Sequence, residues 1–382
     1  MESKSQFESI WQVTFIIVFF SIISVNFWIP LTHIKDFNKL EYRQLSPLPT
    51  YESPKSIISY SKNFENYFND HFSIRYRFII LNRKILVQIF DQKFLADVIR
   101  GKDNWLFWGW GSYKIKCQNA SLLSQSELQE HLYVISNIHE ELESQNIQLF
   151  FLIQPETCTI YPEYSEDVLP ILGKQSMTDQ YINYFQKNNP KIQFIDLRPD
   201  LIAAKDRYQL YYKTDTHWND FGTYFGYRTI INNIFPNIPD EKLIDLVNLS
   251  QKPLLNHSGD LARVFLGLTD LYNEDGALLN YQNSFLTNTL DDGTFIIENP
   301  NAQSDLTLVF YHDSFYVNKL IQELLPNHFK RIIMFHSNKN LHWNPNIDEL
   351  TKLIDQWHPD IILVERVERN FMPFGTRKEN AP

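Results

Sequence analysis

Glycine and cysteine are scarce in this 382-residue chain. It has 11 glycines and 2 cysteines, against an expected glycine content of about 7%. One cysteine pair in so long a chain excludes a disulfide-framework fold, and no CxxC or Cys/His zinc spacing occurs. Whether Cys117 and Cys158 pair is left open, although a domain outside the cytoplasm would allow a bridge between them.

Basic residues are fewer than acidic ones. The 35 Lys and Arg residues are outnumbered by 45 Asp and Glu residues, which gives a formal net charge of −10. The chain shows no basic patch, so we expect no nucleic acid partner. Hydrophobic residues make up 43% and aromatic residues 15% of the chain. This composition predicts a globular protein with a core filled by rings, and sugar stacking is a second use for them.

An uncharged run spans residues 11–29 (WQVTFIIVFFSIISVNFWI). It is long enough to cross a bilayer, which requires about 20 residues, and Trp11 and Trp28 stand where interfacial aromatics are expected. The run is long and lacks a small-residue cleavage site, which favours an uncleaved signal anchor over a cleaved signal peptide. We therefore predict a cytoplasmic tip and membrane anchor over residues 1–30.

The rest of the chain divides into three predicted parts. Residues 31–55 contain several prolines among polar residues and predict an extended linker. The main domain is expected over residues 56–374, beginning with a helical pattern over 56–99. Residues 375–382 are polar and predict a flexible tail.

Apolar runs of strand length alternate with helical patterns in the main domain. The predicted strands are 147–153, 192–196, 306–311, 331–335 and 360–365. The predicted helices among them are 178–187, 220–234, 315–325 and 347–357. This alternation indicates an α/β fold with a mostly parallel sheet flanked by helices.

The first candidate for chemistry is the stretch 213–220 (KTDTHWND). Its Asp215-x-His217 spacing can place a carboxylate beside an imidazole, which fixes the tautomer and stabilises the imidazolium. The same spacing also occurs at metal sites and in ordinary surface loops.

The second candidate is Ser314, which follows an apolar strand and opens a helix. Sheets of this class place ligands at the carboxyl ends of their strands, and the Ser314 N–H would lie at a helix N-terminus suited to an oxyanion. Taken alone, Ser314 is better explained as a helix cap. A serine hydroxyl needs an adjacent base, so Asp215, His217 and Ser314 together predict a catalytic triad.

Several stretches in their order along the chain resemble the SGNH-hydrolase-like alginate O-acetyltransferase family, the AlgJ/AlgX group. The stretches are residues 67–75, 101–107, 160–163, 211–219 (YYKTDTHWN), 259–262, 312–315 (HDSF) and 359–369, preceded by the single N-terminal apolar segment. The resemblance covers residues from about 60 to 371, and the TDTHWN and DSF stretches are its most specific parts.

The resemblance implies an SGNH-like fold in permuted order, with Ser314 as nucleophile, His217 as general base and acid, and Asp215 as its orienter. It implies transfer of an acetyl group from a membrane-bound O-acyltransferase partner, by way of an acetyl-serine, to hydroxyls of an exported polysaccharide. The protein would be single-pass in the cytoplasmic membrane, its anchor in the lipid bilayer and its catalytic domain in the periplasm or outside the cell. No cofactor or metal is expected.

Three further residues are predicted to line the substrate site: Trp218, Tyr161 and His312. Burial in the core is an equal alternative for Trp218. His312 departs from the family pattern, because the SGNH nucleophile block often has glycine there. The sequence also reads Pro155-Glu156-Thr157 where the family pattern has Pro-x-Lys, and it leaves no room for an extra carbohydrate-binding module, which implies the AlgJ type.

Three other hypotheses remain open from the sequence. A carbohydrate acetylesterase would use the same triad and differ only in letting water reach the acyl-enzyme. A metal enzyme would use Asp215, His217 and His312 as ligands. A glycan-binding assembly protein would use none of them chemically.

Overall fold

The computed structural model of the protein describes residues 10–21, 45–50, 57–71, 75–282, 284–336 and 347–370. Residues 10–21 form a helix, and the rest of the predicted anchor lies outside the described residues. None of the described helices is both long enough and apolar enough to cross a membrane. The predicted linker and tail lie largely outside the described ranges.

The chain divides into two compact units, the first comprising residues 1–96 and 262–271. This unit contains α2 (Ile57–His71), α3 (Arg75–Gln88) and β1 (Phe94–Leu95). The prediction of a helical pattern as far as residue 99 was wrong beyond Gln88. Asp91 adopts a left-handed backbone (φ 44°), a conformation that ends helices, and the chain then turns into short strands.

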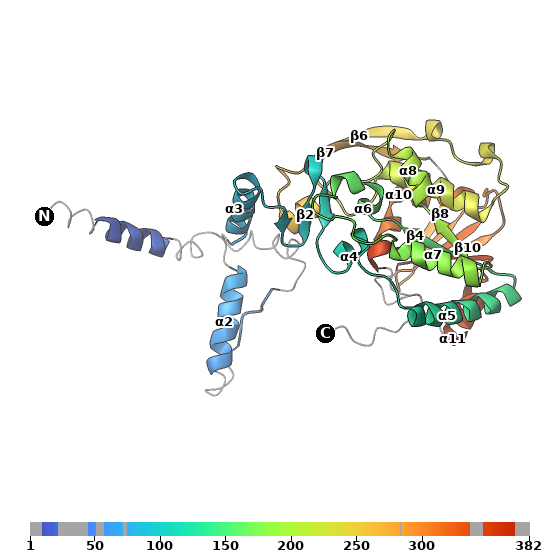
Figure 1. The fold of residues 1–382 in the computed structure, drawn as a ribbon, viewed down its shortest axis with the longest axis horizontal. Coiled ribbons are helices and arrows are strands. Elements are labelled where there is room, and N and C mark those ends of the chain that lie inside the picture. Colours follow the sequence, from blue (N-terminus) through green and yellow to red (C-terminus); the bar gives the residue numbers. More distant parts are fainter. Residues whose placement is uncertain are drawn as a thin grey trace. The chain divides into compact units, whose positions relative to one another are not determined.

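The second unit comprises residues 97–261 and 272–382 and is built on a seven-stranded sheet (Figure 1). The strands lie in the order β5-β4-β12-β10-β11-β9-β8. The first five are parallel, and β9 and β8 join antiparallel at one edge. Their bounds are β4 Gln148–Gln154, β5 Gln193–Asp196, β8 Leu286–Thr289, β9 Phe295–Glu298, β10 Thr307–His312, β11 Arg331–His336 and β12 Ile361–Val367.

Helices cover both faces of the sheet, because its central strands are apolar on both sides. On one face, core residues of the sheet pack with α5 (Gln125–Ser144), α7 (Met177–Asn188) and α11 (Ile347–Trp357). On the other face they pack with α8 (Arg198–Ala204), α9 (Asp220–Ile234) and α10 (Lys319–Leu324). The five predicted strands and the predicted parallel α/β architecture are confirmed. The predicted helix 315–325 is instead a 3-10 turn, η8 (Ser314–Val317), followed by α10.

The last strand, β12, runs between β4 and β10. Successive connections therefore leave this point in opposite directions, β4 to β5 on one side and β10 to β11 on the other. Open α/β sheets place their ligand sites outside the carboxyl ends of the strands at such a switch point. Ser314 follows β10 here, Glu156 follows β4, and Arg369 lies in η10 (Glu368–Asn370) after β12.

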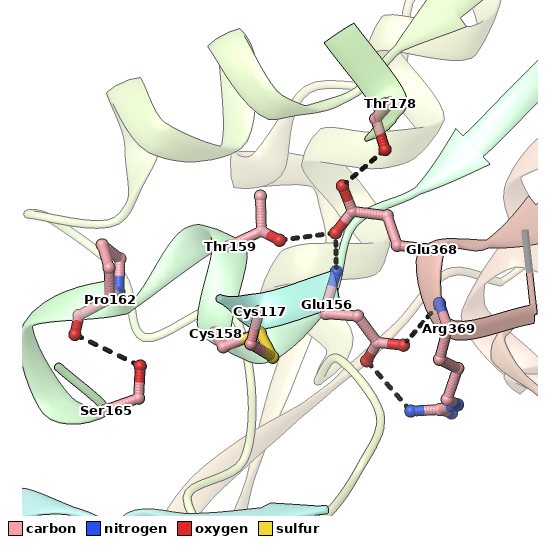
Figure 2. Close-up of a disulfide and its surroundings, with 9 residues drawn as sticks. All are labelled: Cys117, Glu156, Cys158, Thr159, Pro162, Ser165, Thr178, Glu368 and Arg369. Carbon is pink, nitrogen blue, oxygen red and sulfur yellow. Dashed lines mark hydrogen bonds and ion pairs between the residues drawn. A yellow bond between two sulfur atoms is a disulfide. The ribbon is translucent and has the colours of Figure 1, made fainter. Parts of the chain in front are cut away.

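The remaining elements of the chain are shorter. A disulfide joins Cys117 and Cys158, which answers the question that the sequence left open (Figure 2). Cys117 closes α4 (Tyr113–Cys117), and Cys158 lies in α6 (Thr157–Ile160), directly after β4. The remaining strands pair antiparallel as β2 (Val98–Arg100) with β3 (Leu106–Trp108), and β6 (Ser250–His257) with β7 (Glu274–Asn280). The other short helical turns are η3 Lys102–Asn104, η4 Pro162–Tyr164, η5 Asp240–Lys242, η6 Leu246–Asn248, η7 Leu261–Leu266 and η9 Leu325–Asn327.

Candidate active site

Asp215 and His217 lie in a tight loop that is closed at its base by an antiparallel bridge between Tyr211 and Trp218. Asn219 ends the loop and caps α9, with its side chain accepting from the Gly222 N–H at 3.1 Å. Within the loop, Asp215 Oδ1 lies 2.7 Å from His217 Nδ1 and accepts the His217 backbone N–H at 2.9 Å. The carboxylate therefore holds both the main chain and the ring of His217, and Nε2 points away from it.

Ser314 is the first residue of η8, immediately beyond the end of β10. Asp313 is the cap of this turn, because its side chain accepts the Phe315 N–H at 2.9 Å. The explanation of Ser314 as a helix cap was therefore wrong. Its Oγ lies 2.8 Å from His217 Nε2, and Ser314 is exposed to solvent.

The three predicted catalytic side chains thus form one continuous hydrogen-bonded chain, across 97 residues of sequence between His217 and Ser314. Burial works against the charges of Asp215 and His217, but their hydrogen bond and attraction outweigh it. The pKa of Asp215 is accordingly lowered and the pKa of His217 is raised. This arrangement can draw the proton from Ser314 Oγ and stabilise the resulting imidazolium.

Asp260 is a member of the site that the sequence pattern did not reveal. Its N–H donates to Asp215 Oδ2 at 2.8 Å, and its carboxylate accepts from the N–H and the hydroxyl of Thr216. Asp260 Oδ2 also lies 3.7 Å from His217 Nδ1. Burial and the neighbouring Asp215 charge raise the pKa of Asp260. The Gly259-Asp260 pair within the resembling stretches was the available signal.

Glycine is required at position 259 by this close approach. A Cβ there would lie 2.4 Å from the Asp215 Cβ and 2.5 Å from the Thr214 carbonyl oxygen. Any side chain would push the Asp260 N–H away from Asp215.

Trp218, predicted as a substrate contact, is 2% exposed and donates its indole N–H to the Phe315 carbonyl at 3.0 Å. Its ring lies so close to Gly226 that a Cβ there would come within 2.5 Å of it. This burial favours packing, the alternative that the sequence left open. Trp218 ties the His217 loop to the Ser314 turn.

The two other predicted substrate contacts are also buried. Tyr161 accepts the Leu210 N–H at 2.9 Å and packs against Trp105 and Tyr211. His312 has Nδ1 2.8 Å from the Asp313 carbonyl, and burial lowers its pKa to about 4, which keeps the ring neutral. Their assignment to substrate remains a prediction, and the structure shows each supporting the chain next to the triad.

Among the described residues, one set of possible metal ligands lies in the site: Asp215, His217 and Asp260. It does not include His312, the third ligand of the metal hypothesis. The inner oxygens of Asp215 and Asp260 already accept hydrogen bonds from the loop, and His217 Nε2 points to Ser314. The atoms that could bind a metal are therefore already engaged in the hydrogen bonds of the Asp215–His217–Ser314 chain and its loop.

A buried glutamate on the neighbouring strand β12 supports the turn that carries Ser314. Glu365, on β12, accepts the Asp313 N–H through Oε2 at 2.7 Å. Burial, and the nearby Asp313, hold the pKa of Glu365 well above its usual range. A buried carboxyl group whose protonated form is favoured therefore supports the turn that presents Ser314.

A model of the family described as SGNH hydrolase-like domain, acetyltransferase AlgX matches residues 98–287. The match includes Asp215, His217 and Asp260 and ends before Ser314. It contains the loop that orients the proposed base.

Curated relatives carry the name probable alginate O-acetylase AlgJ. That of Pseudomonas syringae pv. tomato is 27% identical over 163 residues, 43% of this chain and 39% of the relative. That of Pseudomonas fluorescens is 22% identical over 219 residues, 56% of this chain and 52% of the relative. The chain spans about half the length of these relatives or less.

Among solved structures, Bacillus cereus PatB1 superposes with a TM-score of 0.52 at 17% identity. The superposition covers 73% of this chain and 99% of PatB1. At this identity the likeness shows that the two share a fold.

Proposed function

Because the chain belongs to the AlgJ/AlgX-like family, we propose that it is a serine-dependent O-acetyltransferase acting on hydroxyls of an exported, alginate-like polysaccharide. The observation that carries the proposal is the contact chain Asp215–His217–Ser314, with distances of 2.7 and 2.8 Å. The names of the curated relatives support acetyl transfer to a polysaccharide.

The reaction has two halves. His217 Nε2 takes the Ser314 hydroxyl proton as Oγ attacks the acetyl carbonyl, and the imidazolium then gives that proton to the departing donor oxygen. In the second half a sugar hydroxyl gives its proton to His217 and attacks the acetyl-serine. The imidazolium then returns that proton to the departing Ser314 Oγ, which restores the free serine. Each half of the reaction passes through a tetrahedral intermediate that carries an oxyanion. The N–H of Ser314 is the first in its helical turn and has no intrahelical acceptor, so it is suited to bind that oxyanion.

The donor would be a membrane-bound O-acyltransferase, and the catalytic domain would lie in the periplasm or outside the cell, held by the N-terminal anchor in the bilayer. The Cys117–Cys158 disulfide supports this location, because such bonds persist in oxidising compartments.

The test uses purified full-length protein and an activated acetyl ester. Wild-type protein should release acetate and accumulate an acetyl-enzyme visible by intact mass, and Ser314→Ala should do neither while keeping its circular dichroism spectrum. Unchanged acetate release by Ser314→Ala would falsify the proposal.

An acetylesterase is the second candidate, favoured by the solvent exposure of Ser314. Adding an acceptor glycan separates the two. Acetylated glycan supports transfer, whereas free acetate alone at saturating acceptor supports hydrolysis.

A further inference from the structure

A buried ion pair lies next to the triad, and the reaction as described does not use it. Arg369 Nη1 lies 3.0 Å from Glu156 Oε2, and the Arg369 N–H donates to Glu156 Oε1 at 3.1 Å (Figure 2). The side chains are only 7% and 1% exposed. Burying two charges costs free energy that their attraction often does not recover, so the pair calls for a reason other than stability.

The Glu156 end of the pair is fixed in place by several bonds. The Glu156 N–H donates to Glu368 at 2.8 Å, and Glu368 also accepts from the hydroxyls of Thr159 and Thr178 (Figure 2). Two residues further along the chain, Cys158 is bound to Cys117. The main chain at Glu156 is thus anchored both after the end of β4 and by the disulfide.

The Arg369 end reaches the catalytic residues through Phe315. The guanidinium carbon lies 5.4 Å from the centre of the Phe315 ring and 4.7 Å from that of Trp108. The His217 ring packs on the same Phe315 ring, with 4.9 Å between the ring centres. Phe315 is also the residue that follows Ser314. One aromatic ring therefore contacts the cation, the base and the turn of the nucleophile.

We propose that Arg369 is a positioning residue for the acetyl-transfer site: Glu156 holds its guanidinium on Phe315, where its positive charge offsets the two carboxylates beside His217. The inference rests on the proposed function. The carboxyl groups of Asp215 and Asp260 lie 2.7 and 3.7 Å from His217 Nδ1 and favour the protonated imidazole, which cannot accept the Ser314 proton. A nearby cation opposes this effect.

The charged groups that act on His217 come from three segments: Asp215 in its own loop, Asp260 in the loop after β6, and Arg369 after β12. Burial lowers the pKa of His217, Asp215 and Asp260 raise it, and Arg369 is the cation that lowers it. Burial raises the pKa of Glu156 to about 7, and Arg369 is the main group opposing that rise.

The experiment is a proton NMR titration of full-length protein labelled at histidine Cε1, with the His217 signal assigned by its absence from His217→Gln. Arg369→Gln should raise the His217 titration midpoint by about half a pH unit or more. The acid limb of kcat/KM should move by the same amount, with KM little changed. Arg369→Lys keeps the charge and should restore both towards wild type.

A folded Arg369→Gln variant whose His217 midpoint and acid limb match wild type would overturn the inference and leave the ion pair a packing feature. If Arg369→Gln does not fold, the double variant Glu156→Gln with Arg369→Gln removes both buried charges and is judged by the same shift. Wild-type protein that shows no Ser314-dependent acetyl release, but whose His217 midpoint still moves, would reject the proposed function alone.

Discussion

The indole N–H of Trp218 donates to the carbonyl of Phe315 at 3.0 Å, so the residue after the proposed base binds the residue after the proposed nucleophile. A second connection runs through Gln154 at the end of β4. Its side chain donates to the Tyr211 hydroxyl at 3.0 Å and accepts from the Tyr316 hydroxyl at 3.0 Å. Two buried bridges thus hold His217 and Ser314 at hydrogen-bond distance.

Trp218→Phe should keep the buried ring and remove its hydrogen bond to Phe315. We expect kcat to fall about tenfold or more, because a small misplacement of base and nucleophile is costly in rate, with a smaller change in KM. Stability should fall by about 1–3 kcal/mol, since the Phe315 carbonyl loses its partner. Steady-state kinetics and chemical denaturation measure the two effects. A wild-type kcat would show that this bridge does not set the geometry.

Asp215→Asn should lower kcat by about 10²–10⁴-fold, because the amide can present an N–H to Nδ1 and favour the wrong imidazole tautomer. Asp260→Asn is the matched control, since Asp260 lies 3.7 Å from the ring and contacts the loop mainly through Thr216. It should lose about tenfold or less. Equal losses in the two variants would contradict the assignment of Asp215 as the orienting residue.

The pH dependence follows from the raised pKa of His217. The base must be neutral to accept the Ser314 proton, so kcat/KM should rise with pH through a midpoint above the ordinary value of about 6.5. Asp260→Asn removes an anion and should move this midpoint downwards. The raised pKa also means that the ion pair stabilises the fold fully below about 6.5, and that this contribution is lost as pH rises through the folded-state pKa. An acid limb centred below 6 would contradict this prediction.

Reduction of the Cys117–Cys158 disulfide should destabilise the protein, because the bond closes a loop spanning 41 positions. Chain-entropy arguments put the loss at about 4 kcal/mol. We expect a lower melting temperature in reductant, measured by circular dichroism. The double variant Cys117→Ala with Cys158→Ala should melt at the reduced temperature whether or not reductant is present. Insensitivity of the wild type to reductant would show that the bond does not form.

Glu365→Gln should preserve the acceptor for the Asp313 N–H while removing a titrating group. The raised pKa of Glu365 means that its contribution to stability is complete below about 4.3 and is lost as pH rises through the folded-state pKa. The variant should therefore lose less stability than wild type as pH rises from about 4.3 through the folded-state pKa of Glu365. Denaturation at several pH values measures this, and parallel curves would contradict it.

Local sequence determined much of this protein. Apolar runs such as 147–153 and 331–335 specify buried strands by themselves, because continuous apolar segments between helical patterns have few other stable conformations. The Asp215-x-His217 contact is equally local, since two residues on one side of a tight loop meet without help from distant parts of the chain.

Tertiary structure alone decided the rest. The insertion of β12 between β4 and β10 brings Glu156, Ser314 and Arg369 to one end of the sheet, and no local pattern encodes which strands become neighbours. The Cys117–Cys158 pairing, the approach of Asp260 to Asp215 and the burial of Trp218 depend on contacts of this kind. Each requires segments far apart in the chain to pack closely, and that packing is set by the whole core.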